Sequence, residues 1–394
     1  MPTLDLPLKK VGKLVFIVIL ICIFTVCIGL GIKYTVQELW ITDRAQHALE
    51  ITTLKYSPDY YVTFTPIVTK YFNKFYNEDM DLKLCDFYIA ASYKSYLPAG
   101  STFDVFSYNA IVNCLTKGAR FIHLDIFSDG LTSFDTSANP IVRNDTLMPY
   151  YGKPLDFRKC CKVINDTAWQ NNTYPLLLFL NIDAVAAKNA SVIDKMANIL
   201  LTEFQNHLMD KKYGFQRSNI SQISIKDLTN QVIILTNSYP NGGTLDELTN
   251  AVIPATGGFV NNFELKQSMI AYGLMSAAVT DSDSMINFNK NNMTRVFMPS
   301  ERLNSNLYDP KIDIMNFDAT SAWNLGCQLV CQNYQIYDDS MKINIAMFKT
   351  CPFVMKPDKL REIPQPPYVP KVQNTKVYFG ANASEDPGWY KFNH

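Results

Sequence analysis

Histidine and unbalanced charge are both scarce in this sequence. The 394 residues include four histidines, and 36 Lys and Arg residues balance 36 Asp and Glu residues. Zero net charge gives no sign of a basic surface for nucleic acid or of an acidic solvating tail. So few histidines leave little material for chemistry that needs paired imidazoles. The remaining composition, 47% hydrophobic, is that of a globular chain with room for one large domain or two ordinary ones.

Cysteine is present, but without the spacing of a structural zinc site. No Cys-x-x-Cys pair occurs, and Cys327 and Cys331 have no second pair of ligands to complete a metal site. We expect Cys327 and Cys331 to be core or disulfide residues. Seven cysteines lie outside the N-terminal apolar run. Because their number is odd, at least one thiol stays free or pairs with another chain. They are Cys85, Cys114, Cys160, Cys161, Cys327, Cys331 and Cys351.

A long apolar run near the N-terminus predicts a membrane anchor. Residues 15–32 carry no charge, and a helix of this length, at about 1.5 Å per residue, nearly crosses a hydrocarbon core of about 30 Å. Lys9, Lys10 and Lys13 precede the run, so we expect residues 1–14 in the cytosol. The rest of the chain would then be lumenal, extracellular or on the equivalent side of a viral membrane. A cleaved signal peptide is the alternative, although no clean small-residue cleavage site follows the run.

Seven Asn-x-Ser/Thr sequons agree with a non-cytosolic location for most of the chain. An Asn-rich sequence produces several by chance, so each is only a candidate glycosylation site. The candidates are Asn144, Asn165, Asn171, Asn189, Asn219, Asn292 and Asn382.

Short apolar runs recur from residue 84 onward, with helical or loop segments between them. Continuous apolar strands of this kind are typical of a parallel sheet that is covered on both faces. The expected strands are 87–92, 121–127, 176–182, 232–235, 327–334 and 353–355.

Helices are expected at 184–208, where apolar residues recur at helical spacing, and at 244–252 and 265–279. The last two lie in a segment that interrupts the strand rhythm after the turn sequence Pro-Asn-Gly-Gly at 240–243. Residues 33–83 read as a stalk or an N-terminal helical segment. A Pro-rich stretch begins at residue 363, so we expect residues 363–394 to form a tail.

Two sets of motifs resemble the eukaryotic phosphoinositide-specific phospholipase C family. Residues 323–330 (WNLGCQLV) and 333–335 (NYQ) are similar to the W-N-x-G-C-Q-x-V…N-F-Q motif of its Y half. In the X half, residues 87–97 (FYIAASYKSYL) are similar to F-I-x-S-S-H-N-T-Y-L. Residues 118–125 (GARFIHLD) are similar to G-C-R-x-I-E-L-D, and 174–181 (YPLLLFLN) to Y-P-V-I-L-S-L-E.

The resemblance implies an α/β fold, a distorted (β/α)8 TIM-type barrel preceded here by the transmembrane helix 15–32. It divides the barrel into an X-like half at 84–240, a linker at 241–284 and a Y-like half at 285–362. Barrels of this type place their chemistry at the C-terminal ends of the strands. The family's reaction needs a general base, a histidine general acid, and calcium to neutralise the phosphate.

The positions that match the family's catalytic histidines and first calcium ligands have changed. Tyr93 stands where the first catalytic histidine belongs, and Arg143 falls where the second would lie. Lys94 replaces a calcium-ligating asparagine, and His123 replaces a calcium-ligating glutamate. Asp125 alone keeps the type of its ligand.

Other positions of the matching site have changed more mildly. Asn181 replaces another calcium-ligating glutamate, and Leu235 and Asn237 replace two phosphate-binding lysines. Arg295 and Phe297 resemble the family pair in which the arginine contacts a headgroup phosphate and an aromatic ring stacks on the inositol. Phe297 could equally be wall packing.

These substitutions predict that the calcium cofactor and the acid–base pair are absent. Calcium takes six to eight oxygen ligands, and a tyrosine phenol has a pKa near 10. We expect Lys94 to pair with Asp125 in place of the missing cation, with Arg143 and Arg295 around the mouth of the pocket. That pocket would attract an anion, or else hold an inert salt bridge. His123 is either a base or metal ligand, or a hydrogen-bonded core residue, and Asp125 either a retained ligand or a structural partner.

Three functions remain open from the sequence. We favour a membrane-tethered pseudoenzyme that acts as a structural or binding module, with a protein or an anionic headgroup as partner and no nucleic acid. The first alternative is a phosphodiester hydrolase with altered chemistry that uses His123. The second is a binder of inositol phosphates or lipid headgroups that does not turn them over.

Overall fold

The computed structural model describes the parts of the chain that carry its fold and the candidate site. Contacts divide the chain into one unit of residues 1–361 and another of 362–394, and the helices and strands belong to the first unit. Most of the expected stalk (33–83) and tail (363–394) lie outside the described residues. The described residues are 13, 15–33, 35–36, 39, 82–98, 106–130, 132–144, 153–170, 172–238, 243–253, 262–266, 281–297 and 316–363.

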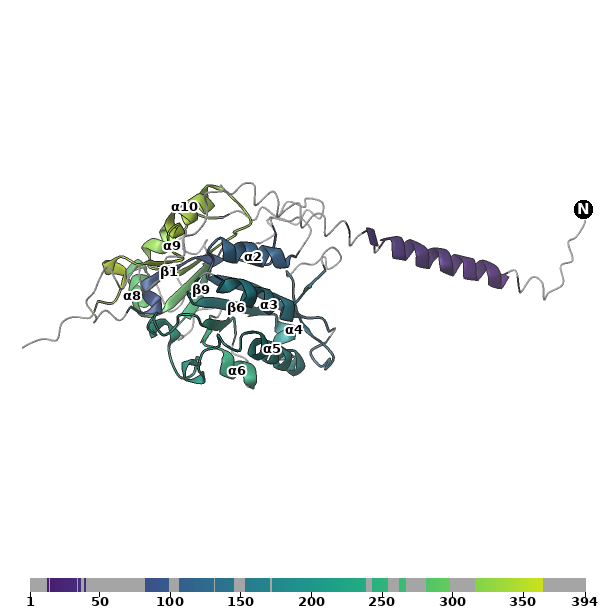
Figure 1. Ribbon diagram of the computed structural model, residues 1–394, viewed down its shortest axis with the longest axis horizontal. Coiled ribbons are helices and arrows are strands. Elements are labelled where there is room, and N and C mark those ends of the chain that lie inside the picture. The colour runs from purple at the N-terminus through teal and green to yellow at the C-terminus, as the bar shows by residue number, and fades with distance from the viewer. Residues whose placement is uncertain are drawn as a thin grey trace, which may run out of the picture. The chain divides into compact units, whose positions relative to one another are not determined.

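The apolar N-terminal run forms one helix, Val15–Lys33 (purple in Figure 1). Its length and composition suffice to cross a membrane, and its side chains are exposed in the structure. The expected helix is confirmed.

Eight parallel strands form the central sheet, in the order β8-β7-β6-β3-β2-β11-β10-β9. From β2 to β11 the strands follow one another in chain order. They form a barrel, because β8 also lies against β9. In the described parts of the chain, no backbone ladder joins those two strands. The expected (β/α)8 class is confirmed. The strands are β2 (Ala91–Ser92), β3 (Phe121–Ser128), β6 (Leu176–Ile182), β7 (Val232–Thr236), β8 (Ala251–Val252), β9 (Asn262–Lys266), β10 (Met293–Phe297) and β11 (Leu329–Gln332).

Short antiparallel strands supplement the barrel. β1 (Phe87–Ile89) pairs with β12 (Phe353–Met355) just before β2 begins. β4 (Pro140–Val142) pairs with β3 and with β5 (Leu155–Asp156).

The expected strand 87–92 is divided at Ala90. The Ala90 N–H donates to the carbonyl of Pro352, whereas its own carbonyl accepts from the N–H groups of Arg120 and Phe121. The backbone therefore changes partners at this residue, from the β12 side to the β3 side. A run of apolar residues gives no sign of such a change.

Helices cover the outside of the sheet, as Figure 1 shows. α2, α3, α5 and α6 follow one another along the X-half strands, in contact with each other. α8, α9 and α10 accompany the strands of the other half. The helices are α2 (Tyr108–Thr116), α3 (Phe157–Ala168), α4 (Ala184–Lys188), α5 (Ala190–Glu203), α6 (Thr244–Leu248), α8 (Ser282–Asn291), α9 (Thr320–Asn324) and α10 (Asp339–Phe348). Short 3-10 turns lie at Leu84–Asp86, Lys211–Tyr213, Ile220–Gln222 and Asp358–Leu360.

Alternation along the strands builds two apolar layers. On β6, Leu176, Leu178 and Leu180 face the helices, whereas Leu177 and Phe179 face the barrel interior. A strand buried on both sides lacks the polar alternation of a half-exposed strand, which is why β6 reads as a continuous apolar run. The interior layer ends at the C-terminal ends of the strands, where inward positions become polar.

Two sequence predictions for helices are wrong in detail. The expected helix 184–208 is broken at Asn189, whose extended backbone and side-chain bond to the Val192 N–H cap α5. Asn favours such a cap because its carbonyl oxygen satisfies a free N–H group of the first turn. The expected helix 244–252 ends at Leu248 and is followed by β8.

The segment expected as a linker, 241–284, contributes β8 and β9 to the barrel. Residues 265–266 of the expected helix 265–279 belong to β9, which pairs in parallel with β10. Residues 267–279 lie outside the described residues.

All nine cysteines are free thiols, and the seven from Cys85 onward are buried. Of the two alternatives expected for Cys327 and Cys331, core or disulfide, the structure has the first. Burial raises the pKa of the Cys114 and Cys327 thiols to about 12, so these groups stay protonated and behave as small apolar side chains.

Asn189→Ala is expected to lower the free energy of unfolding by about 1–2 kcal/mol. The change removes the α5 cap, and it also removes a hydrogen bond from the Asn189 amide to the carbonyl of Asp135 (2.9 Å). Urea unfolding of the full-length chain measures the loss. The matched control is Asn198→Ala, at an exposed position of the same helix, which should stay within about 0.5 kcal/mol of the original chain. Equal stability of both variants would contradict the capping role.

Candidate functional site

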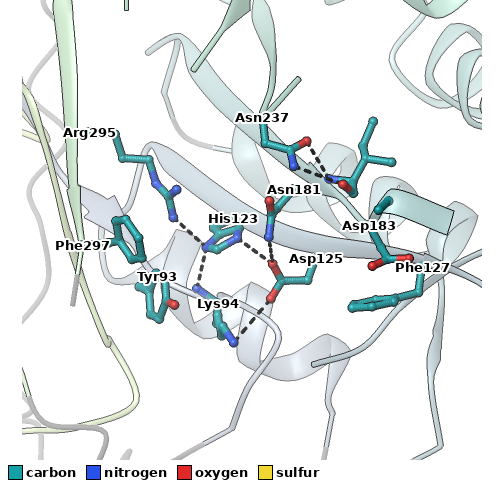
Figure 2. Close-up of a pocket in the computed structure, with 12 residues that line it drawn as sticks. Tyr93, Lys94, His123, Asp125, Phe127, Asn181, Asp183, Asn237, Arg295 and Phe297 are labelled. Atoms are coloured by element: carbon teal, nitrogen blue, oxygen red, sulfur yellow. Dashed lines mark hydrogen bonds and ion pairs between the residues drawn. The ribbon is translucent and has the colours of Figure 1, made fainter. Parts of the chain in front are cut away.

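A pocket of about 380 Å³ lies where the barrel strands end. The side chains that line it come from the inward positions of β3, β6 and β10 and from the residues just after β2, β6 and β7. Figure 2 shows them converging on one cluster. Eight of the ten residues singled out in the sequence line this pocket. They are Tyr93, Lys94, His123, Asp125, Asn181, Asn237, Arg295 and Phe297.

Asp125 is the centre of the cluster and is almost fully buried. Its Oδ1 accepts from His123 Nε2 (3.0 Å) and Asn181 Nδ2 (2.6 Å). Its Oδ2 accepts from the hydroxyl of Tyr96, and the Lys94 Nζ lies 3.7 Å away. Burial by itself raises the pKa of this carboxyl, but its interactions with His123 and Lys94 and the hydrogen bond from Tyr96 together lower it well below its usual range. Asp125 is therefore an ionised carboxylate whose oxygens are held by protein donors.

His123 is held as a neutral imidazole. Its Nδ1 faces two donors, the backbone N–H of Lys94 (3.2 Å) and Nη2 of Arg295 (3.1 Å), while Nε2 faces Asp125. This network assigns the proton to Nε2, because Nδ1 must accept. Burial lowers the pKa of His123 to about 4, although the nearby Asp125 carboxylate opposes that shift. Both ring nitrogens are thus engaged by protein groups.

Lys94 reaches the carboxylate from an unusual backbone conformation. Its φ is 42°, in the left-handed region that residues other than Gly, Asn and Asp rarely adopt. The turn is held by a hydrogen bond from Gln335 Nε2 to the Lys94 carbonyl (3.3 Å) and by the bond to His123. The Lys94 Nζ donates to Oδ1 of Asn144 and lies beside Asp125. The expected Lys94–Asp125 pair is confirmed.

Arg295 lies inside the barrel in an aromatic box. Its guanidinium carbon is 4.3 Å from the ring centre of Phe179 and 4.8 Å from that of Phe297. Tyr93 stacks on Phe297, with ring centres 5.7 Å apart. Figure 2 shows Arg295 pointing at His123. The expectation that Arg295 would stand at the mouth is wrong, because the inward face of β10 directs it into the interior.

Arg143 also departs from the expectation. It does not line the pocket; its guanidinium carbon lies 4.0 Å from the ring centre of Phe127, which does line it. Its backbone carbonyl accepts from the Tyr96 hydroxyl (3.2 Å). Arg143 therefore supports the site through its main chain and leaves its charge outside.

Leu235 on β7 and Asn237 just after it have separate roles. Leu235 is fully buried in the barrel core, so it packs and does not face the pocket. Asn237 accepts from the N–H of Ile182 (2.9 Å) and donates to its carbonyl (3.1 Å). This pair of bonds fixes the end of β6 and so the direction of Asn181.

Two of the candidate glycosylation sites are corrected by burial. Asn144 is 6% exposed and its amide oxygen holds Lys94, while Asn189 is 2% exposed and its Nδ2 donates to Asp135. A glycan on either Nδ2 has no room in the folded chain. The remaining described candidates are partly buried, and their glycosylation stays a prediction; they are Asn165, Asn219 and Asn292. Asn171 and Asn382 lie outside the described residues.

Calcium, which the resemblance associates with this position, does not fit these residues. A calcium site needs several carboxylates or free carbonyl oxygens, and Asp125 is the one carboxylate at the centre of the cluster. Its oxygens already accept from protein donors, and an ammonium lies next to it. Nowhere in the described ranges do three or more His, Cys, Asp or Glu side chains gather in a way that could hold a metal ion.

Sequence reasoning missed two residues of the cluster, Tyr96 and Phe179, and the role of a third, Asn144. Tyr96 supplies a buried hydroxyl to Asp125, and Asn144 supplies an amide oxygen to Lys94. Phe179 forms one wall of the aromatic box. Tyr96 lies within the motif at 87–97. Phe179 lies two residues before Asn181, on the same face of β6. The sequence could therefore have identified both as site residues. Asn144 was considered as a candidate glycosylation site in the loop that borders the pocket, and not as a partner of Lys94.

Comparison with known proteins supports the architecture. The model "Phosphatidylinositol-specific phospholipase C, X domain" matches residues 80–238, and the corresponding Y-domain model matches residues 259–359. The crystal structure of L. pealei PLC21 superposes with a TM-score of 0.56 at 18% identity, covering 72% of this chain and 38% of the other. That likeness shows the fold.

Curated relatives include proteins described as inactive and proteins described as enzymes. "Inactive phospholipase C-like protein 1" of Mus musculus is 24% identical over 72% of this chain and 28% of its own length. "Phosphoinositide phospholipase C 1" of Arabidopsis thaliana is also 24% identical, over 72% of this chain and 54% of its own length. The chain spans about a quarter to a half of the length of these relatives. The two domain matches, the shared barrel and the relatives together lead to one assignment: the chain belongs to the phosphatidylinositol-specific phospholipase C family, with its X and Y domains in one barrel.

Proposed function

We propose that this chain is a membrane-anchored phospholipase C-like barrel that does not hydrolyse phosphoinositides and acts as a structural or binding module. The observation that carries the proposal is the state of Asp125. Its two oxygens are held by three protein donors, and the Lys94 ammonium lies where the family pattern has a calcium ligand. A phosphate in this pocket would meet no divalent cation to neutralise its developing charge.

The availability of a base also argues against hydrolysis. A general base must present a free lone pair to the proton that it takes. The Nδ1 lone pair of His123 already accepts from Lys94 and Arg295, and its Nε2 proton is given to Asp125. Tyr93 stacks on Phe297 and takes the place of a catalytic histidine. The alternative of altered chemistry through His123 therefore has little support.

The charges of the pocket argue against a strong anion site. Two cations, Lys94 and Arg295, and two carboxylates, Asp125 and Asp183, line it, so their formal charges cancel. Lys94 is paired with Asp125, and the Arg295 guanidinium is enclosed by aromatic rings. Binding of an inositol phosphate or lipid headgroup would have to rely on weak contacts.

The N-terminal helix supports the anchored part of the proposal. Val15–Lys33 is long and apolar enough to span a bilayer. Lys9, Lys10 and Lys13 on its N-terminal side favour a cytosolic N-terminus, with the barrel on the opposite side. Phosphoinositide headgroups face the cytosol. A barrel on the opposite side of the membrane would therefore have little access to them.

Purified full-length chain in detergent is expected to release no inositol phosphate from phosphatidylinositol 4,5-bisphosphate micelles, with or without millimolar calcium. Loss of the metal and of the acid–base pair should each cost at least about 100-fold in rate. The matched control is Asp125→Asn, which should give the same background. Turnover by the original chain that disappears in Asp125→Asn would refute the proposal.

His123 should contribute to stability in a pH-dependent way. Its folded pKa, about 4, lies below the unfolded value of 6.5, so its contribution is complete above pH 6.5 and is lost as the pH falls toward 4. A shift of this size corresponds to about 3 kcal/mol. His123→Gln should therefore show a flatter decline of unfolding free energy over this range.

Thermal and urea unfolding between pH 7 and pH 4 measure the two curves. The control is His207→Gln, outside the barrel interior, where the ring stacks on Trp169. That variant keeps His123 and should keep the original decline. Parallel curves for the original chain and His123→Gln would show that His123 is not held neutral.

A further inference from the structure

We propose that Lys94 and Asn144 join through an isopeptide bond that the folded chain forms by itself, with Asp125 as the carrier of the proton. The bond would link the turn after β2 to the chain just after β4. This inference goes beyond the proposed function and does not depend on it, because a covalent link inside the barrel is compatible with either outcome of the hydrolysis assay.

The contact between the two side chains is the first argument. Lys94 Nζ donates to Oδ1 of Asn144, and the amide carbon of Asn144 is the atom bonded to that oxygen. The amine nitrogen and the carbon that it would attack are therefore neighbours before any reaction. Groups held together in this way react with effective molarities of about 10⁵–10⁸ M when their orientation is right.

The surrounding segments fix this contact, which is the second argument. The N–H of Arg143 donates to the carbonyl of Asp125 (3.3 Å), and the Tyr96 hydroxyl bonds both to Asp125 Oδ2 (2.5 Å) and to the Arg143 carbonyl (3.2 Å). The residue before Asn144 is thus tied to Asp125 through its N–H and through its carbonyl. From the other side, the Lys94 backbone with its φ of 42° directs the amine into the pocket.

Burial beside a carboxylate is the third argument. Lys94 is 9% exposed, Asn144 6% and Asp125 3%. Lys94 Nζ lies 3.7 Å from Asp125 Oδ2, and Figure 2 shows the ammonium pointing at that carboxylate. A lysine attacks a carbonyl carbon only after it has lost its proton, and desolvation of the amine favours that loss. The site therefore places an amine, an amide and a proton acceptor together, out of bulk water.

The reaction needs no cofactor and no second reactant. The Lys94 ammonium passes one proton to Asp125, and the neutral amine attacks Cγ of Asn144. A bond forms between Nζ and Cγ, and the bond between Cγ and Nδ2 breaks. Asp125 gives its proton to the departing Nδ2 and takes the excess proton from Nζ. Ammonia leaves with that last proton as an ammonium ion, and Asp125 is a carboxylate again.

The resting state of the pair makes the reaction slow. Asp125 is ionised in the folded chain, so the neutral amine and the protonated carboxyl form a minor state. A bond that forms once in each molecule does not need fast turnover. We therefore expect linkage over hours and not within seconds.

The bond would stabilise a barrel whose thiols are free. It closes a ring through residues 94–144, which contains α2, β3 and β4. Such a ring lowers the entropy of the unfolded chain, as a disulfide does. All nine cysteines are free thiols, and an isopeptide bond, unlike a disulfide, is not broken by reduction.

Two further Lys–Asn contacts provide controls within the same chain. Lys195 Nζ donates to Oδ1 of Asn139 (3.2 Å), and Lys290 Nζ donates to Oδ1 of Asn287 (3.3 Å). Both contacts lie at the surface. They have the same donor and acceptor as the buried pair but are hydrated, so we expect them to stay unlinked.

Peptide mapping by mass spectrometry tests the proposal on the full-length chain, produced in bacteria, purified in detergent and incubated overnight before reduction and digestion. We expect a branched peptide that contains Lys94 and Asn144 and is lighter than its two parts by one ammonia, about 17 Da. Lys94→Met and Asn144→Ala should each lack it.

Three results of this mapping would overturn the proposal. The first is the absence of the branched peptide from the original chain. The second is a branch from Lys94 to Asp125, which loses water and not ammonia. The third is equal linkage at the two surface pairs, since it would show that burial and the carboxylate have no part in the reaction.

The part of Asp125 is tested with two replacements, Asp125→Asn and Asp125→Ser, both of which keep the amine and the amide. Circular dichroism identifies the folded variants. A folded variant should form the bond at least about 100-fold more slowly than the original chain, because it lacks the proton carrier. Linkage at the original rate would overturn the role of Asp125. If neither variant folds, the map of the original chain still decides whether the bond exists.

Discussion

A buried carboxylate must be matched by protein donors, because its transfer out of water costs several kcal/mol. Asp125 is such a group, and the end of the barrel is organised around it. β3 contributes His123, the turn after β2 contributes Lys94 and Tyr96, and β6 contributes Asn181. Each partner is held in turn, His123 by Arg295 and the Lys94 turn by Gln335. In a metal-binding relative of this architecture the ion would take this organising role; here side chains take it.

Several residues of the motifs that identify the family make structural contacts in the barrel and take no part in the pocket. Gln328 donates from Nε2 to the carbonyls of Cys85, Asn289 and Asn292, so it ties the chain before β1 to the segment around α8. Gly326 has a φ of 77°, which suits a residue without a side chain at the end of α9. These residues hold the barrel together and do not line the pocket. A sequence can therefore keep a clear family resemblance after its site has changed.

Much of the fold could be predicted from the sequence, because strands buried on both faces leave continuous apolar runs. β3, β6 and β12 were predicted to within one residue of their bounds. β8 and β9 were missed, since two-residue and five-residue strands in a polar segment leave no such run. In the site, substitution logic predicted the Lys94–Asp125 pair, because a lone buried carboxylate calls for a cation. It failed for Arg143 and Arg295, whose side-chain directions depend on the face of the strand and on the loop geometry, neither of which a motif encodes.

The X and Y domains are joined more strongly on one side of the barrel than on the other, where β8 meets β9. The X and Y domains are joined on one side by the β2–β11 ladder and by the β1–β12 clasp. On the other side β8 and β9 touch, yet the described residues share no ladder there. The covalent crossing from one domain to the other runs through that weaker side. Cutting the peptide chain between β8 and β9 would therefore separate no paired strands. The two fragments would stay joined through the β2–β11 and β1–β12 pairs on the opposite side of the barrel.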